Sequence, residues 1–306
     1  MRRRLGAGAL ALATGFALVG CGISGGGETD PPGMDPADAV ASCADLPAGT
    51  DTQAVEAYDR VNMYRLAMGA GCVHFVPEIA SAARAHCEYY VGNHGDCIAS
   101  PHKEISGCDG FRGERFAERM TRSGYIGHPA YEVMTYVGSG AAAVDAWVNS
   151  LWHRIPILSP SAGDAGYGSV AGRCDTMDFG WRATSATDVA LVYPFDAQTG
   201  VPTSFDGDSE SPPPPRPPRG WPSGYPIIVY ASGIAVESHR LFDDHSVAVD
   251  HTFIAPGDAA AAGLLLQEVV MYADRPLKKG TVYRVVIEGT RAASPVHLEW
   301  TFTTHT

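Results

Sequence analysis

Residues Ala143–Pro160, AVDAWVNSLWHRIPILSP, decide the fold of this chain. Their apolar side chains recur at i, i+3, i+4 and i+7, which predicts an amphipathic helix with one buried face. These side chains are Val144, Trp147, Val148 and Leu151. The helix leads to His153 and Arg154, and Pro156 predicts that Ile155–Pro160 does not continue as helix. A polar pair at the end of an apolar helix indicates a place where a ligand binds or chemistry occurs.

Length and composition indicate a globular protein with room for two domains. The chain has 306 residues, of which 45% are hydrophobic and 18% charged. Its formal net charge is −12, and no stretch of the sequence forms a basic stripe. Nucleic acids and anionic lipid surfaces are therefore not expected as electrostatic partners.

The first twenty residues have the pattern of an export signal. Arg2–Arg4 precede an apolar run, Leu5–Val19, which is too short to span a bilayer comfortably. The run ends in Leu-Val-Gly-Cys21, which resembles the bacterial lipobox, whose cysteine is lipidated. We therefore expect a signal peptide over 1–20, a lipid anchor on Cys21 as the membrane contact, and location in a bacterial cell envelope, facing the periplasm or exterior. An ordinary signal peptide without lipidation is the alternative.

The remaining six cysteines are expected to form disulfides, because an even number in an exported chain is typical of a disulfide framework. They are Cys43, Cys72, Cys87, Cys97, Cys108 and Cys174. Six cysteines allow about fifteen pairings, so the connectivity stays open. A Cys97–Cys108 loop is one hypothesis.

Helices and short strands alternate in the first half of the chain, after a Gly-, Pro- and Asp-rich stretch over 21–52 that predicts a flexible tether. The expected helices are Gln53–Met68, Pro77–Gly92 and Phe111–Ser123. The expected strands are Tyr131–Val137, Ala165–Ala171 and Thr176–Phe179. This pattern predicts an α+β domain over 53–182, in α-β-α layers.

Short β-branched or aromatic runs fill the second half, which predicts an all-β sandwich over 187–306. The runs are Val189–Val192, Ile227–Tyr230, Val247–Phe253, Leu264–Tyr272, Thr281–Glu288 and Leu298–Thr303. Asp188–Pro202, PLKKGTVYRVVIEG and the terminal EWTFTT resemble bacterial Ig-like domains. In that pattern the first strand precedes the proline run, so we interpret Ser211–Pro218 as a loop inside this domain.

Four stretches of the first half resemble the CAP superfamily in its bacterial form, also called SCP or PR-1-like. They are Asn62-Met63-Tyr64-Arg65 with Gly69, Ala82-Ala83-Arg84-Ala85-His86, Gly124-Tyr125 with Glu132, and Trp147–Arg154 with Ile157–Pro160 and Gly166-Tyr167-Gly168. The last resembles W-x-x-S-x-x-H-R-x-x-I-L…G-x-G and is the most specific. Together they cover about residues 53–182.

The resemblance implies an α-β-α sandwich with a groove where two histidines and two acidic residues meet. His153 matches the histidine of the H-R element, Glu132 the glutamate of the E-N element, and His102 the histidine of the loop after the second helix. The second acid, expected near Asn149 and Ser150, is absent. Val133 also replaces the asparagine that usually follows the glutamate.

The resulting site hypothesis is a ligand groove lined by His102, Glu132, Asn149, Ser150 and His153. His102, His153 and Glu132 are the candidate metal ligands, with zinc as the example, because imidazole and carboxylate are its usual donors. No cofactor is certain.

Three functions remain open at this point. The first is a non-catalytic, membrane-tethered module that binds a small molecule, a lipid or a peptide, with the Ig-like domain as a spacer. The second is a peptidase or esterase with His153 as general base and Glu132 orienting water or sharing a metal. The third is adhesion through the Ig-like domain.

Overall fold

The computed structural model describes residues 43–44, 46–182, 190–258, 261 and 263–306. The predicted signal peptide, the lipidation site at Cys21 and most of the predicted tether lie outside these residues. The end of that tether is bonded to the first domain, because Cys43 forms a disulfide with Cys72. None of the helices in the described ranges is both long and apolar enough to cross a bilayer.

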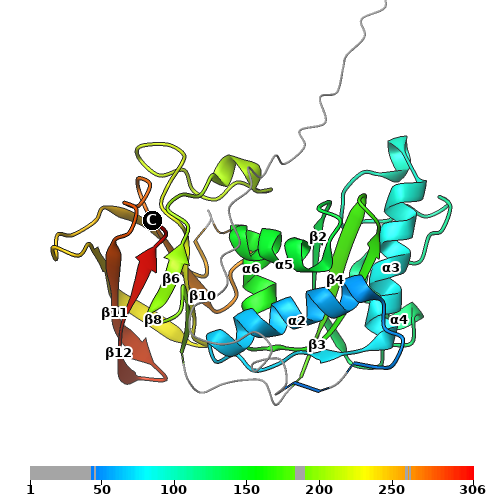
Figure 1. The fold of residues 1–306 in the computed structure, drawn as a ribbon, viewed down its shortest axis with the longest axis horizontal. Coiled ribbons are helices and arrows are strands. Elements are labelled where there is room, and N and C mark those ends of the chain that lie inside the picture. The colour runs from blue at the N-terminus through cyan, green and yellow to red at the C-terminus, as the bar shows by residue number, and fades with distance from the viewer. Residues whose placement is uncertain (1–42, 45, 183–189, 259–260, 262) are drawn as a thin grey trace, which may run out of the picture.

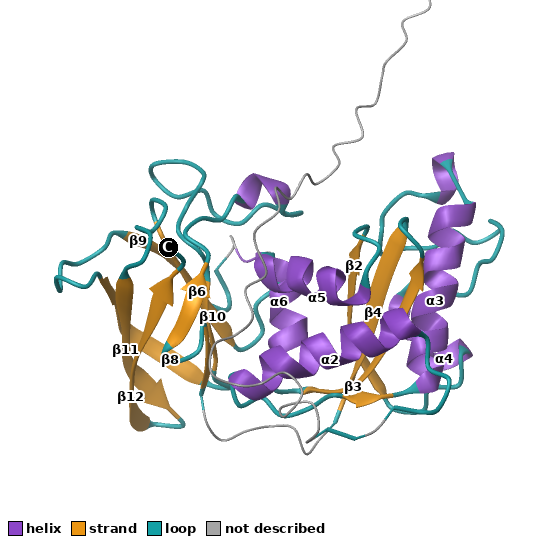
Figure 2. Ribbon diagram, in the orientation of Figure 1, coloured by secondary structure: helices purple, strands orange, loops and turns teal. Residues whose placement is uncertain are grey.

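A four-stranded sheet lies between two layers of helices in the first half of the chain (Figures 1 and 2). Its strand order is β1-β3-β4-β2, with β1 parallel to β3 and the other neighbours antiparallel. The strands are β1 (His74–Phe75), β2 (His128–Thr135), β3 (Ala162–Val170) and β4 (Cys174–Trp181). The helices are α2 (Thr52–Ala67), α3 (Pro77–Gly92), α4 (Phe116–Arg122), α5 (Gly140–Asn149) and α6 (Leu151–Leu158).

Helix α3 packs directly against β3 because two glycines leave room for its backbone. A Cβ atom on Gly166 would lie 2.1 Å from the backbone nitrogen of Ala80, and one on Gly168 would lie 2.1 Å from that of Arg84. Any side chain at either position would force the helix away from the sheet. The Gly-Tyr-Gly motif is therefore a packing element.

The organising segment is two helices and not one, which corrects the sequence prediction. The chain leaves the helical conformation at Ser150, whose side chain caps α6 by accepting from the backbone N–H of His153. Pro156 lies inside α6, where a proline removes a hydrogen bond. The helix is retained because every residue of α6 except His153 is buried.

Other predicted boundaries in this half were also wrong, including the start of β3 at Ala162 and that of β4 at Cys174. The predicted helix Phe111–Ser123 begins only at Phe116, because Glu104 Oε2 accepts from the backbone N–H of Arg112 and of Gly113 and holds that stretch as a loop. The predicted strand Tyr131–Val137 lies earlier, at His128–Thr135.

Arg65 of the Asn-x-x-Arg motif is fully buried and binds backbone carbonyl groups. Its guanidinium donates to the carbonyls of Ile157 and Ser159 at the end of α6, and to that of Ala162 on β3. Asn62 accepts from the backbone N–H of Val73. This motif therefore joins α2 to the end of α6 and to the sheet.

The second half forms two four-stranded sheets, ordered β5-β7-β10-β9 and β6-β12-β11-β8. Their strands are β5 (Leu191–Tyr193), β6 (Gln198–Val201), β7 (Ile227–Tyr230), β8 (Ile234–Phe242), β9 (His251–Ile254), β10 (Glu268–Ala273), β11 (Val282–Arg291) and β12 (Ser294–Thr304). The sequence missed β6 and β8 and placed the starts of β9 and β10 too early. Strand β8 was not predicted because it lacks a continuous apolar run. Its half-exposed and exposed positions include Glu237, His239 and Arg240.

One hydrophobic core runs through both halves of the molecule. Trp147 and Leu151 of the first half belong to the same buried cluster as Tyr225 and Tyr230 of the second. Figure 1 shows α5 and α6 between the first sheet and the second half. These helices therefore link the two halves.

Candidate functional site

His153 is positioned by the break between α5 and α6. It lies in the first turn of α6, and its Nδ1 is 2.8 Å from the hydroxyl of Ser150. The ring is partly buried. Burial, together with the charge of His102, lowers the pKa of His153 to about 4, so the ring is neutral at physiological pH.

His102 and Glu132 form a hydrogen-bonded pair beside it. Glu132 projects from β2, and its Oε1 lies 2.9 Å from Nδ1 of His102, whose side chain is 43% exposed. An ionised carboxylate only accepts, so His102 carries a proton on Nδ1. Although burial opposes it, hydrogen bonding to His102 and the charges of His86, Arg119 and His102 lower the pKa of Glu132 to about 2.

The two imidazoles lie next to each other. The ring centroids of His102 and His153 are 6.3 Å apart, with an angle of 34° between the planes. Nδ1 of each ring faces an oxygen of the protein. Neither Nε2 has a hydrogen-bond partner among the residues that the structure describes. The two Nε2 atoms of this pair are therefore the part of the predicted site that can bind a ligand.

A fully buried network of charges lies behind His102. Arg119 donates to Glu132 through Nη2 and lies 3.7 Å from Glu104 through Nε. His86 places Nδ1 3.0 Å from Glu104 and Nε2 2.8 Å from the carbonyl of Pro101. The carbonyl of Pro101 can only accept, so Nε2 of His86 carries a proton.

Asp178 completes this network as a neutral acid. It faces Glu132 across the β2–β4 ladder and is fully buried. Burial and the charge of Glu132 raise the pKa of Asp178 well above its usual range. As a neutral acid Asp178 has a proton to donate, and it makes a side-chain hydrogen bond with Glu132.

These residues do not fit a metal ion. No group of three or more histidine, cysteine, aspartate or glutamate side chains in the described ranges has a geometry that could hold one. The oxygens of Glu132 are occupied by Arg119 and by His102, and the guanidinium would repel a cation. We therefore derive no chemistry through zinc.

The structure brings His102, Glu132, Ser150 and His153 together but directs Asn149 elsewhere. Asn149 accepts a hydrogen bond of 3.0 Å from the hydroxyl of Tyr225 in the second half. The Ser150 hydroxyl donates to Glu210 at 2.7 Å, although it remains in contact with His153.

Sequence reasoning missed four residues around the site. They are Glu104, Arg119, Asp178 and Glu210. His86 lies on α3 with a fully buried side chain and contacts Glu104. The sequence did contain a signal for Asp178, because an aspartate between apolar residues of a predicted strand indicates a buried acid that needs a partner.

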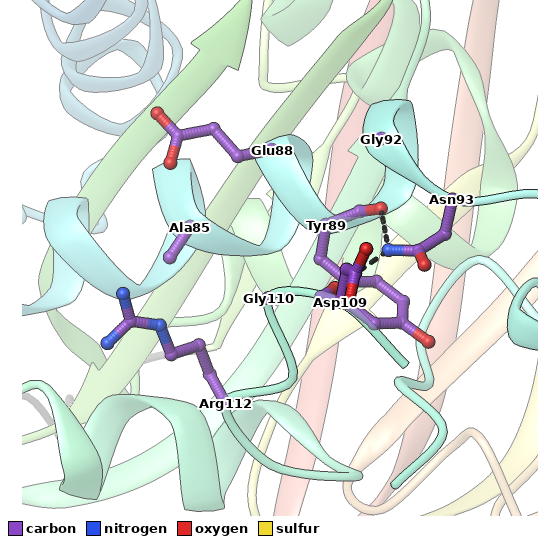
Figure 3. Close-up of a pocket in the computed structure, with 8 residues that line it drawn as sticks. All are labelled: Ala85, Glu88, Tyr89, Gly92, Asn93, Asp109, Gly110 and Arg112. Carbon is purple, nitrogen blue, oxygen red and sulfur yellow. Dashed lines mark hydrogen bonds between the residues drawn. The ribbon is translucent and has the colours of Figure 1, made fainter. Parts of the chain in front are cut away.

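A surface hollow of about 200 Å³ lies elsewhere, between the end of α3 and the loop that follows Cys108 (Figure 3). Its walls include Glu88, Asn93 and Arg112, and Asn93 there donates to the carbonyls of Tyr89 and Asp109. The side chains of His102, Glu132 and His153 are not part of its lining. The hollow is therefore separate from the imidazole pair.

Three disulfides join the first half. They are Cys43–Cys72, Cys87–Cys174 and Cys97–Cys108, and the last is the pair that the sequence analysis hypothesised. Such a framework is consistent with a protein that folds outside the cytoplasm.

Residues 58–181 match the model of CAP, the cysteine-rich secretory protein family. This segment is a CAP domain. The match confirms the resemblance noted from the motifs, and it covers less than half of the 306 residues. The helix-sheet-helix layers, His102, Glu132 and His153 all belong to the CAP domain.

An extracellular protein of Bacillus anthracis that contains an SCP domain is similar to the chain, with a TM-score of 0.37 and 18% sequence identity. The alignment covers 46% of this chain and 45% of that one, so the chain spans less than half of that protein's length. The comparison with curated proteins gave no match.

Proposed function

We propose that the chain is an exported, membrane-tethered protein whose CAP domain is a non-catalytic binding module for a small molecule, a lipid or a peptide. The observation that carries this proposal is the His102–His153 pair. Each ring has its Nδ1 engaged by the protein, which leaves both Nε2 atoms for a ligand. Half-exposed His102 forms the accessible side of the site.

The chemistry of the pair indicates what it would bind. His153 is neutral and its unprotonated nitrogen accepts hydrogen bonds. The chain as a whole is acidic, with a net charge of −12. A ligand that carries hydrogen-bond donors, such as amines or hydroxyl groups, suits both properties better than an anion does.

Three features weigh against the alternative of a hydrolase that uses His153 and Glu132. A pKa of about 4 makes His153 a weak base at neutral pH. One oxygen of Glu132 is bound by His102 and the other by Arg119, so the carboxylate is not placed to orient a water molecule. The hydroxyl of Ser150 contacts Glu210, His153 and a backbone N–H, which ties this oxygen to a structural role and not to that of a nucleophile.

The proposal includes the lipid anchor on Cys21 and an Ig-like fold for 187–306, with the proline run inside it. The disulfides support export. The antiparallel pairing of β5 with β7, on either side of the proline run, supports the placement of Ser211–Pro218 within the second domain.

NMR of the histidine-labelled chain, titrated with a panel of short peptides, amines and sugars, tests the binding site. A compound that binds through the pair should shift the ring resonances of His102 and His153 in the purified chain. His153→Gln should weaken its binding at least tenfold, whereas His245→Gln, at a ring that is 79% exposed on the second half, should leave it unchanged. Binders that move neither ring would contradict the proposal. A catalytic role would instead appear as ester or peptide hydrolysis lost in His153→Gln.

A further inference from the structure

Glu210 reaches the CAP domain from the second half of the chain. It follows the short helix Gly207–Ser209, and only 7% of its surface is exposed. Its Oε1 lies 2.7 Å from the hydroxyl of Ser150 and 2.6 Å from the backbone nitrogen of Leu151. The carboxylate therefore accepts two hydrogen bonds at the start of α6, where a negative charge is favoured.

The segment that carries Glu210 is held to α6 by flanking contacts. Trp152 donates through its indole N–H to the carbonyl of Pro212, at 2.6 Å. Arg154 donates to the carbonyl of Pro226, at 2.6 Å, and its guanidinium carbon lies 4.3 Å from the ring centre of Tyr225. Glu210 is therefore fixed relative to Ser150 by neighbours on the same helix.

The hydrogen bonds of the Ser150 hydroxyl determine which nitrogen of His153 carries the proton. A hydroxyl has one proton, and the carboxylate of Glu210 is an acceptor, so that proton is donated to Glu210. The Ser150 oxygen then accepts from Nδ1 of His153. Nδ1 must carry the proton of the neutral ring, and Nε2 must carry the lone pair. Which nitrogen holds the proton is set by the hydrogen bond that the other makes or lacks.

We propose that Glu210 is a positioning residue of the imidazole pair, which acts through Ser150 to hold His153 in the Nδ1–H tautomer with its Nε2 free to accept from a ligand. The inference rests on the proposed function in that the pair is taken as the binding site. It also assigns the second half a role beyond that of a spacer, since this half supplies an acid for a site whose own helix, at Asn149 and Ser150, has none.

NMR of the chain labelled with ¹⁵N at histidine tests this inference without any ligand. Long-range ¹H–¹⁵N correlation at pH 7.5 distinguishes a protonated from an unprotonated ring nitrogen, and His153→Gln assigns the signals by their loss. We expect a protonated Nδ1 and an unprotonated Nε2 in the wild type. An Nε2–H ring in the wild type overturns the proposal whether or not any variant folds.

Two variants and a control separate positioning from general destabilisation. Ser150→Ala should move most of the population to the Nε2–H tautomer, which predominates in free histidine. Glu210→Gln should give a mixture, because an amide can donate to Ser150 as well as accept. Glu237→Gln removes the same charge from an exposed position on β8 and should leave the spectrum unchanged. A Ser150→Ala ring that stays Nδ1–H overturns the proposal.

The two proposals fail separately. If His153 is Nδ1–H and responds to Ser150→Ala, but no probe moves either ring, the positioning role of Glu210 stands and the binding function does not. If probes bind through His153 but the ring is Nε2–H, the reverse holds.

Discussion

Arg65 and Arg119 are both fully buried, and their partners define two different roles. Arg65 donates to carbonyl groups, and burial lowers its pKa to about 10, which still leaves it charged at neutral pH. Arg119 donates to the carboxylate of Glu132, which in turn contacts His102. The first arginine therefore stabilises the fold, and the second fixes the acid behind the site.

His153 should make the stability of the chain sensitive to mild acid. Its pKa falls from 6.5 to about 4 on folding. Between these values the unfolded chain binds a proton that the folded chain does not, so stability decreases as the pH falls from 6.5 to 4. We expect His153 to account for up to about 3 kcal/mol of that loss. Urea unfolding at a series of pH values measures it.

His153→Gln should flatten this part of the pH profile. The exposed control His245→Gln should retain the wild-type slope, since its ring is 79% exposed. Equal slopes for wild type and His153→Gln would show that the folded ring titrates near its ordinary pKa.

The sequence could predict which residues of the CAP domain meet, but not what holds them. Motif matching brought His102, Glu132 and His153 into one site. Asp178 could not be paired with Glu132 beforehand, because that contact depends on the register of two strands. Glu210 is 60 positions from Ser150, and nothing in the local pattern of either stretch indicates the contact.

At the scale of elements, periodicity was reliable where one face of a helix is buried. Helix α3 begins at Pro77 and ends at Gly92, as predicted. The break between α5 and α6 was not predictable from the 3.6-residue period, because Ser150 leaves the helix to bind Glu210 and to cap α6. Tertiary contacts override local propensity there.

Two disulfides should differ in their contribution to stability because they close loops of different length. Cys87–Cys174 joins α3 to β4 across 87 positions, whereas Cys97–Cys108 spans 11. The loss of chain entropy in the unfolded state predicts about 4.5 kcal/mol for the first and about 3 kcal/mol for the second. Paired Cys→Ala variants, compared by chemical denaturation, measure the difference. Equal losses, or a larger loss for Cys97–Cys108, would contradict this prediction.

One hydrophobic cluster spans both halves of the described chain, and Arg154 lies where these halves meet. Its guanidinium carbon is 4.3 Å from the ring centre of Tyr225 and 5.1 Å from that of Tyr193, and it donates to carbonyls of Val148 and Pro226. A buried cation that contacts both halves should couple their unfolding.

Arg154→Ala should destabilise the chain by about 3 kcal/mol, through lost cation–π contact and unpaired carbonyls. Circular dichroism and tryptophan fluorescence should still report one coincident transition. Arg284→Ala is the matched control, because Arg284 also stacks on an aromatic ring, that of Phe242, but is partly exposed and stays within one sheet. Its cost should stay below about 1 kcal/mol. Separate transitions for the two halves would contradict the shared core.

The hydrogen bonds from Ser150 and Leu151 to Glu210 have a practical consequence for protein engineering. A chimera that grafts residues 58–181 onto another scaffold would carry every recognised motif, yet the Ser150 hydroxyl would lose its acceptor and the start of α6 its carboxylate. Such a chimera would contain His102 and His153 but would lack Glu210, which orients His153 through Ser150. Any version of this module placed on another scaffold should extend at least to Tyr230, whose hydroxyl donates to the backbone carbonyl of Arg154.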